Sequence, residues 1–124
     1  MSIRYAPAIL SEVAVALRNY VETGETRTIY VSQLPLTQED AGFIQDFLGH
    51  GRILIQSNSP DVTIWRESAT PGIWWGEYHV GPQHVQLRTI EITEVPELSC
   101  AQMDDVMDGL PAFEGRVSKV VSSQ

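Results

Sequence analysis

The sequence predicts an α+β fold in which a four- to five-stranded, mainly antiparallel sheet carries about three helices on one face. Three observations lead to this fold class. Apolar residues recur at spacings of three and four before residue 50 and again after residue 99, which is typical of amphipathic helices. Between residues 51 and 93 the period falls to two, which indicates strands. Only short turn-forming segments separate these strands, and short connections favour antiparallel pairing.

Two helices and one strand are predicted in the first 50 residues. The first helix covers residues 8–22, and Gly24 follows it as a residue that can end a helix in the left-handed conformation. Residues 28–31 are all β-branched or aromatic, and they predict a short strand. The second helix begins near Thr37, which has the spacing of a capping box with Asp40, and Gly49 closes it.

Four further strands follow, and the last of them changes phase. They are predicted over residues 53–55, 62–66, 73–75 and 85–93, with turns at residues 58–60, 71–72 and 81–82. In the last strand, Val85 and Leu87 occupy one register and Ile90 and Ile92 the other. This change of phase predicts a bulge near residues 88–89, at Arg88 or Thr89.

The third helix is predicted to begin after Ser99, which has the spacing of a capping box with Gln102. Pro111 lacks an amide proton and its ring clashes with the preceding turn, so we expect a kink or a restart there. The three helices should cover one face of the sheet. The opposite face would then be solvated or used for binding.

Composition predicts one cytoplasmic domain over residues 1–124. The formal net charge is −8 with only eight Lys and Arg residues, which excludes binding to nucleic acid or to an anionic membrane surface. The apolar runs are far shorter than the roughly 20 residues of a bilayer span, so we expect no membrane insertion. The N-terminus does not resemble a signal peptide, and the single cysteine, Cys100, allows no internal disulfide.

We expect no catalytic centre, no metal site and no cofactor. The chain contains neither a Gly-rich phosphate loop nor an H-E-x-x-H motif. His79 and His84 flank the turn at residues 81–82 and could face one another across a hairpin. Two ligands are too few for a zinc site, which needs three or four. We therefore interpret these histidines as exposed hairpin residues.

All three tryptophans lie on one predicted hairpin, over residues 65–75. Trp74 and Trp75 are neighbours on a strand, so their side chains must point to opposite faces of the sheet. In one interpretation all three rings pack in the core or on the sheet. In the other, the outward ring joins Trp65 in an exposed patch, because Trp and Arg are enriched in binding hot spots. This second interpretation makes the hairpin a candidate partner-binding site that comprises Trp65, Arg66, Glu67, Thr70, Pro71, Gly72, Trp74 and Trp75.

The second candidate surface is acidic. No Lys or Arg occurs between residues 89 and 115, where seven carboxylates fall. A solvated acidic face is the simpler interpretation. The alternative is a docking surface for a basic segment, whose affinity would depend on salt. The candidate residues for such docking are Glu91, Glu94, Glu97, Asp104 and Asp105.

Three segments of the sequence resemble the conserved C-terminal region of the HupH/HoxQ/HyaF hydrogenase expression and formation proteins. They are VSQLPLT at residues 31–37, ESATPGIWW at residues 67–75 and IEITEVP at residues 90–96. The likeness runs from the first helix to about Leu110, and its most specific part is the E-x-x-x-P-G-I-W-W segment with the I-E-I-T-E-V-P strand. The chain departs from the family pattern at Gly76, where an apolar residue is usual, and at Thr70, where an aromatic residue is common.

The resemblance implies a non-catalytic role in the maturation of an uptake nickel–iron hydrogenase. The partners that it implies are the precursor of the iron–sulfur small subunit and a thioredoxin-like hydrogenase accessory protein. Typical family members carry an additional N-terminal region, so a homodimer in which a second copy supplies what that region provides is a third alternative. The competing class of function is an enzyme or a small-molecule-binding domain with a pocket near the tryptophans.

Overall fold

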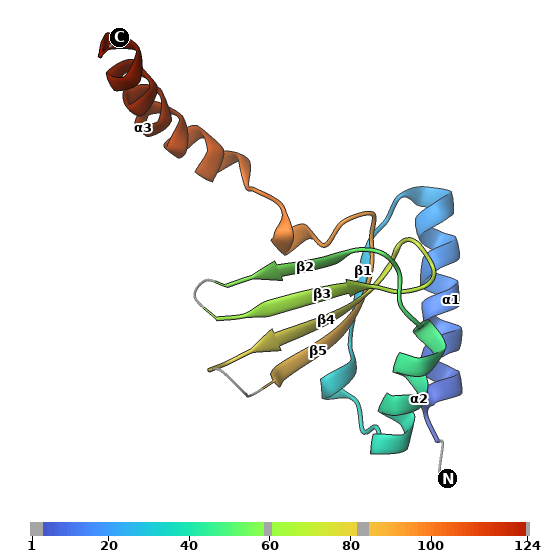
Figure 1. Ribbon diagram of the computed structural model, residues 1–124. Helices are drawn as coiled ribbons and strands as arrows, with labels where there is room; N and C mark the ends of the chain where they lie inside the picture. The colour runs from blue at the N-terminus through green and yellow to red at the C-terminus, as the bar shows by residue number, and fades with distance from the viewer. Residues whose placement is uncertain (1–3, 59–60, 82–84, 124) are drawn as a thin grey trace.

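The computed structural model describes residues 4–58, 61–81 and 85–123. Within these residues the α+β class is confirmed, with a five-stranded antiparallel sheet and three α-helices (Figure 1). The turns predicted at residues 58–60 and 81–82 lie partly outside the described residues. The elements, in chain order, are α1 (Ala6–Thr23), β1 (Arg27–Tyr30), a 3₁₀ turn η1 (Val31–Gln33), α2 (Gln38–Leu48), β2 (Leu54–Ser57), β3 (Thr63–Glu67), β4 (Ile73–His79), β5 (Val85–Ile92), a 3₁₀ turn η2 (Glu97–Ser99) and α3 (Met103–Ser122).

The strands lie in the order β1-β5-β4-β3-β2, and every neighbouring pair is antiparallel. The predicted pairing of successive strands is therefore confirmed from β2 to β5. The sequence did not predict the remaining pair, in which β1 lies beside β5 with Ile29 opposite Ile90. Both residues are apolar and buried, and this pairing joins the first strand to the last.

A bulge does lie in β5, but not at the predicted Arg88 or Thr89. In the described residues Tyr78 of β4 lies opposite Leu87 and His79 lies opposite Val85, so Gln86 of β5 is the extra residue. From Leu87 to Ile92 the pairing is regular. Leu87, Thr89 and Glu91 share one face of this strand because side chains alternate along it. The apparent change of phase arises because the apolar Leu87 lies on the face of Thr89 and Glu91, whereas Ile90 and Ile92 lie on the other face.

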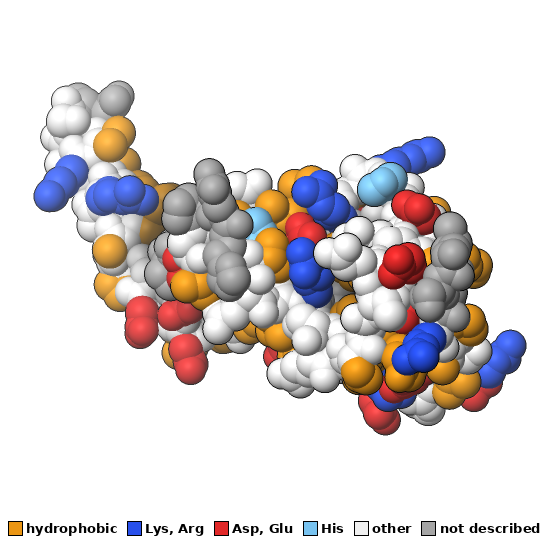
Figure 2. All heavy atoms as spheres, turned by 90° about the horizontal axis from the view of Figure 1, so that it is seen from below, with side chains coloured by type: hydrophobic (Ala, Val, Ile, Leu, Met, Phe, Trp, Pro, Cys, Tyr) orange, Lys and Arg blue, Asp and Glu red, His pale blue; other side chains and the backbone are white. Residues whose placement is uncertain are grey.

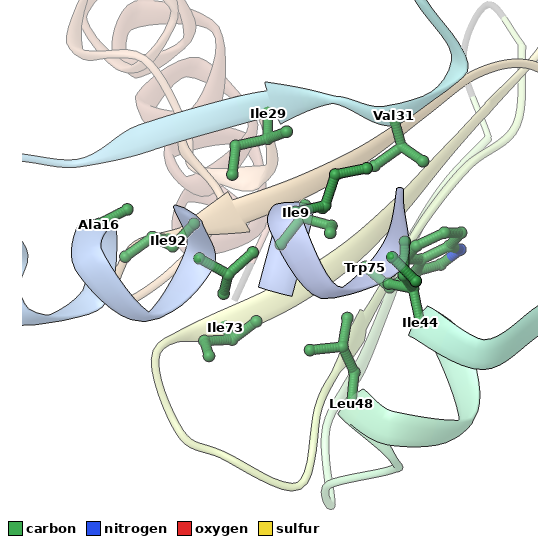
Figure 3. Packing of buried hydrophobic residues seen from close by; sticks show 12 residues of the cluster. Ile9, Ala16, Ile29, Val31, Ile44, Leu48, Ile73, Trp75 and Ile92 are labelled. Carbon is green, nitrogen blue, oxygen red and sulfur yellow. The ribbon is translucent and has the colours of Figure 1, made fainter. Parts of the chain in front are cut away.

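Helices α1 and α2 cover the same face of the sheet (Figure 1). Figure 3 shows their apolar side chains against those of the strands, with Trp75 among them. Gly24 ends α1 in the left-handed conformation, with a φ of 78° and its amide bonded to the carbonyl of Tyr20, as predicted. The core on this face comprises Ala6, Ile9, Val13, Ala16, Ile29, Val31, Ile44, Leu48, Ile73, Trp75, Ile90 and Ile92.

The buried carboxylate of Asp40 anchors the starts of both helices. Its Oδ1 accepts hydrogen bonds from the amides of Arg4, Tyr5 and Ala6, at 2.8–3.1 Å, where α1 begins. Its Oδ2 accepts from the amide of Thr37, while the Thr37 hydroxyl accepts from the amide of Asp40, so the predicted capping box is confirmed. Burial raises the pKa of Asp40, but these amides outweigh it and lower the pKa to about 2.

Protonation of Asp40 is expected to destabilise the fold. Because its folded pKa of about 2 lies below the ordinary value of 3.8, its contribution is present above pH 3.8 and is lost as the pH falls toward 2. Asp40→Asn should weaken this acid dependence and lower the melting temperature at neutral pH. Thr37→Ala, which removes a single cap worth about 1 kcal/mol, should lower it less. Thermal unfolding followed by circular dichroism between pH 2 and 7 tests this, and equal effects of the two changes would contradict it.

The segment that follows β5 covers the middle of the sheet's second face. Pro96 is fully buried, and η2 contacts β2 at the far side of the sheet from β5. Leu98 borders a cavity of about 240 Å³ together with Tyr30, Tyr78 and Leu87. The second face of the sheet is therefore partly enclosed by the chain itself, and this decides how exposed the tryptophans are.

Helix α3 differs from its prediction in three respects. It does not pack on the sheet: it projects from the body of the molecule (Figure 1), and no described residue of it is buried. The reason is that α1 and α2 already cover the helix-bearing face. The predicted restart is wrong, because one helix runs through Pro111. The predicted capping box of Ser99 and Gln102 is wrong too. Gln102 is itself the N-cap of α3, and the Ser99 hydroxyl donates a hydrogen bond to the carbonyl of Pro96.

None of the helices in the described part of the chain combines the length and the apolar content that a bilayer crossing requires.

Candidate functional site

The register of the β3–β4 hairpin determines which way each tryptophan points. Residues directly opposite in an antiparallel pair share a face. Trp65 lies opposite Gly76, and Glu67 lies opposite Trp74, so both Trp65 and Trp74 point to the face away from α1 and α2. Trp75 points to the other face and joins the core beneath the helices (Figure 3). The predicted opposition of Trp74 and Trp75 is confirmed.

The prediction of an exposed aromatic patch is wrong, because all three tryptophan rings are buried. Trp65 and Trp74 are each 2% exposed and Trp75 is 6% exposed. The indole of Trp74 donates to the carbonyl of Thr93 at 3.1 Å, which ties it to the segment that covers this face. The interpretation in which the three tryptophans pack in the core or on the sheet is the one that the structure bears out.

A buried carboxylate lies at the centre of the second face. Glu91 is only 7% exposed, and three side chains converge on its Oε2. The Thr89 hydroxyl donates at 2.7 Å, the Tyr78 hydroxyl at 2.8 Å and the Trp65 indole at 3.2 Å. Glu91 is therefore not part of the solvated acidic surface that the sequence suggested, because these donors satisfy its charge inside the fold.

Tyr78 links this carboxylate to Trp65. The two rings meet edge to face with centroids 5.8 Å apart, a favourable aromatic geometry. Burial and the hydrogen bond to Glu91 raise the pKa of Tyr78 to about 12. The phenol therefore stays protonated and remains a donor to Glu91 across the physiological pH range.

Gly76 makes room for this cluster. A Cβ atom at this position would lie 2.3 Å from Thr89 Oγ1 and 2.8 Å from Glu91 Oε2. The Trp65 ring, directly opposite Gly76 in the sheet, reaches the Glu91 carboxylate across the space that a side chain would fill. We name this group, Trp65, Gly76, Tyr78, Thr89 and Glu91, the Glu91 cluster.

The other predicted acidic residues are exposed and lie along one stretch of chain. Glu94 and Glu97 belong to the segment that covers the second face, and Asp104 and Asp105 lie in the first turn of α3. Glu97 also borders, together with Glu91, cavities of about 290 and 240 Å³. The structure thus separates the buried Glu91 from the four exposed carboxylates, which we name the acidic stretch.

The remaining hairpin residues lie at the turn end of β3 and β4. Thr70 and Pro71 are exposed, and Gly72 takes a φ of 95°, which favours glycine. Glu67 accepts a hydrogen bond from the amide of Arg52 at 3.0 Å. These residues surround the turn without forming a continuous aromatic surface.

A small cavity lies beside Trp75, where the sequence left a pocket open as an alternative. Its volume is about 190 Å³, and its lining includes the charged or titratable residues Asp46, His50 and Arg66. Small-molecule pockets typically measure about 300–1,000 Å³. This cavity is smaller than that range, but Trp75 also borders a second hollow of about 410 Å³ together with Gln45, Glu77 and Arg88, which falls within it.

No group of three or more metal-ligating side chains occurs among residues 4–58, 61–81 and 85–123. His84, one member of the predicted histidine pair, lies outside the described residues. His79 is half-buried, and its Nε2 atom is buried without a hydrogen-bond partner in the described chain. The interpretation of His79 as an exposed hairpin residue is therefore wrong.

Comparison with known proteins decides the family. Residues 3–120 match the family described as "HupH hydrogenase expression protein, C-terminal conserved region". The chain belongs to this family. The resemblance carried by residues 31–37, 67–75 and 90–96 is therefore confirmed.

Individual relatives agree with this assignment. The chain is 30% identical over 105 residues to the hydrogenase expression/formation protein HupQ of Azotobacter chroococcum mcd 1, covering 83% of this chain and 37% of that protein. It is 30% identical over 118 residues to HupH of Rhodobacter capsulatus, covering 95% and 41%. The chain thus spans about two-fifths of the length of these curated relatives.

A solved HupH structure shares the fold. The hydrogenase expression protein HupH from Thiobacillus denitrificans ATCC 25259 superposes with a TM-score of 0.86 at 32% identity, covering 92% of this chain and 95% of that one. The matched 92% of this chain is more than the portion that precedes Met103, where α3 begins. The match therefore extends into α3.

The Glu91 cluster explains why a glycine follows the tryptophan pair: Thr89 and Glu91 occupy the space that a Cβ atom at Gly76 would need. Sequence reasoning missed Tyr78 and Thr89 as members of the cluster. Strict alternation along β5, which places Leu87, Thr89 and Glu91 on one face, was the signal that could have found Thr89.

Proposed function

We propose that this chain is a non-catalytic accessory protein in the maturation of an uptake nickel–iron hydrogenase, and that it binds the precursor of the iron–sulfur small subunit. A thioredoxin-like hydrogenase accessory protein is the second partner that we propose. Membership of the HupH family over residues 3–120 supports the maturation role, since the curated relatives are named hydrogenase expression/formation proteins. The acidic stretch supports binding of a basic segment on a protein partner.

The acidic stretch is the observation that carries the proposed binding. Its four carboxylates, Glu94, Glu97, Asp104 and Asp105, are all exposed. No Lys or Arg lies between residues 89 and 115 to neutralise them along the chain. Such a single-sign surface attracts an oppositely charged segment and fixes its orientation, with a strength that falls as salt is added.

The tryptophans contribute to this proposal only indirectly. The Trp74 indole donates a hydrogen bond to the carbonyl of Thr93. Thr93 directly precedes the acidic stretch, so the buried ring positions the segment that carries Glu94 and Glu97. Trp75 borders hollows of about 190 and 410 Å³, and only the larger reaches the usual size of a small-molecule site. We base the choice of protein docking over a pocket-based function on the family membership and the acidic stretch.

Replacing the acidic stretch with amides tests the proposal. In the variant Glu94→Gln, Glu97→Gln, Asp104→Asn and Asp105→Asn, the affinity for the small-subunit precursor should fall about tenfold or more at low salt. The difference should shrink as the ionic strength rises, because the Debye length falls from about 30 Å at 0.01 M to about 8 Å at 0.15 M. Isothermal titration calorimetry at several salt concentrations measures both effects.

The matched control changes the same number of exposed carboxylates elsewhere. Glu22→Gln, Glu25→Gln, Asp46→Asn and Asp61→Asn alter the net charge equally but leave the acidic stretch intact, since all four are exposed on the body of the molecule. This control should retain most of the affinity. Equal losses in both variants would show that only net charge matters, and no loss in either would discard electrostatic docking.

A further inference from the structure

One oxygen of the buried Glu91 carboxylate is left without a donor by the described residues. The three side-chain donors of the Glu91 cluster all share its Oε2. Among residues 4–58, 61–81 and 85–123, His79 Nε2 is the one side-chain atom that is fully buried without a partner. Oε1 therefore stays in contact with the space beside it, where it can accept a hydrogen bond from a ligand.

The space beside Glu91 is lined as a site for a cation would be. It is the cavity of about 240 Å³ between the sheet and η2, which we name the Glu91 hollow. Its described lining contains no Lys or Arg. Aromatic rings and carboxylates both attract cations. The lining combines two carboxylates, two phenol rings and two leucine side chains: Glu91, Glu97, Tyr30, Tyr78, Leu87 and Leu98.

The register of the sheet brings these residues together from separate parts of the chain. Tyr30 of β1 lies opposite Thr89, so it shares the second face with Glu91. Tyr78 of β4 lies opposite Leu87 on the same face. Glu97 comes from η2, in the segment that covers this face. The hollow thus has a buried carboxylate on the sheet and an exposed carboxylate on the covering segment.

The cation of this chain that lies closest to the hollow in the sheet is already paired. Arg27 borders an adjoining cavity of about 290 Å³, which Glu91 and Glu97 also border. However, Arg27 lies opposite Ile92, so its side chain points to the face that carries the helices. There its guanidinium pairs with Glu12 of α1. A cation for the Glu91 hollow must therefore come from another molecule.

The dimensions and chemistry of the hollow indicate an arginine side chain. Its volume is below the roughly 300–1,000 Å³ of ordinary small-molecule sites, so it suits a single side chain. Arginine and lysine both carry an apolar stem that can pack on leucine and aromatic surface while the charged head reaches a carboxylate. The guanidinium is the better match, because it is planar, stacks on aromatic rings and can donate to two carboxylates at once.

We infer that the Glu91 hollow binds one arginine side chain of the basic segment that the acidic stretch recruits. This inference rests on the proposed function and names the residue type that the site recognises. Glu97 belongs both to the acidic stretch and to the lining of the hollow, so one surface leads into the other. Figure 2 shows further acidic side chains on the part of α3 nearest the body of the molecule.

Titration with a blocked Gly-Arg-Gly tripeptide tests the hollow without any protein partner. Heteronuclear NMR of the isotope-labelled whole chain reports on the indole N–H of Trp65, which donates to Glu91. We expect this signal to shift on titration, with a dissociation constant in the millimolar range. The indole of Trp75 lies on the opposite face of the sheet and should not shift, so it serves as an internal control.

Two matched peptides test the preference for arginine. Citrulline has nearly the shape of arginine but no charge, so blocked Gly-citrulline-Gly should leave the Trp65 signal in place. Blocked Gly-Lys-Gly should shift it with a weaker affinity, because an ammonium group lacks the planar set of donors. Equal shifts with all three peptides would overturn the inference, and so would the absence of any shift with the arginine peptide.

Two variants at exposed positions locate the site without disturbing the buried cluster. Glu97→Gln should raise the dissociation constant of the arginine peptide about two- to fivefold, the range of an exposed ion pair. Glu22→Gln removes the same charge at an exposed position that borders neither cavity, and should leave the constant unchanged. Leu98→Trp, at a position that is 70% exposed, should fill the hollow and abolish the shift. Equal effects of Glu97→Gln and Glu22→Gln would contradict a local site.

Failure of this inference and failure of the proposed function give different results. Salt-dependent binding of the small-subunit precursor by a chain whose Trp65 signal ignores the arginine peptide would overturn this inference alone. An arginine-specific shift in a chain that does not bind the precursor would support the Glu91 hollow as an arginine site. It would overturn only the partner proposed above.

Discussion

Trp65→Ala is expected to lower the free energy of unfolding by about 3–5 kcal/mol, the usual cost of removing a buried aromatic side chain. The ring is 2% exposed, and it packs edge to face on Tyr78 while its indole donates to Glu91. Its removal leaves a cavity and also strips one donor from a buried carboxylate, which adds to the cost. Urea denaturation followed by circular dichroism measures the loss.

Two further variants separate packing from hydrogen bonding at this position. Trp65→Phe keeps an aromatic ring but lacks the indole donor, so its destabilisation should fall between those of the parent and Trp65→Ala. Arg66→Ala, at the next position on the strand, changes an exposed side chain and should cost at most about 0.5 kcal/mol. A Trp65→Ala protein of parental stability that had lost partner binding would instead restore the interpretation of an exposed recognition patch.

Gly76→Ala is expected to destabilise the fold by about 2–4 kcal/mol, which is a large effect for the addition of one methyl group. The new Cβ would lie 2.3 Å from Thr89 Oγ1 and 2.8 Å from Glu91 Oε2. Neither side chain can move without breaking its hydrogen bond to the other, which measures 2.7 Å. The substitution therefore strains the strand and the Glu91 cluster together, and chemical denaturation should show both as one loss of stability.

Gly42→Ala is the matched control for this change. Gly42 lies on α2, where an added Cβ atom would have nothing within 4 Å beyond the backbone of its own helix, so alanine there should stabilise the protein by up to about 1 kcal/mol. Adding Thr89→Ala to Gly76→Ala should recover part of the loss, because it removes the nearer clashing atom. Additive effects of Gly76→Ala and Thr89→Ala in a double-mutant cycle would show that the two residues do not contact one another.

Local chemistry determined most of the secondary structure. The capping box of Thr37 and Asp40 and the ending of α1 at Gly24 depend on residues within a few positions of one another, so sequence spacing predicted them. The alternation of a strand likewise required Trp74 and Trp75 to point to opposite faces. The acidic stretch and the family resemblance also came from the sequence alone.

The tertiary structure decided what lies over each surface. Asp40 had a recognisable local role, yet its second role at the start of α1 depends on residues that lie 34 to 36 positions away. Trp65 and Glu91 meet only because β3 and β5 flank β4, and the segment after β5 then covers them. Burial depends on such distant contacts, which no local pattern encodes. For the same reason the apolar stripe of α3 predicted a helix correctly, while only the tertiary structure shows that the described part of this chain leaves that stripe uncovered.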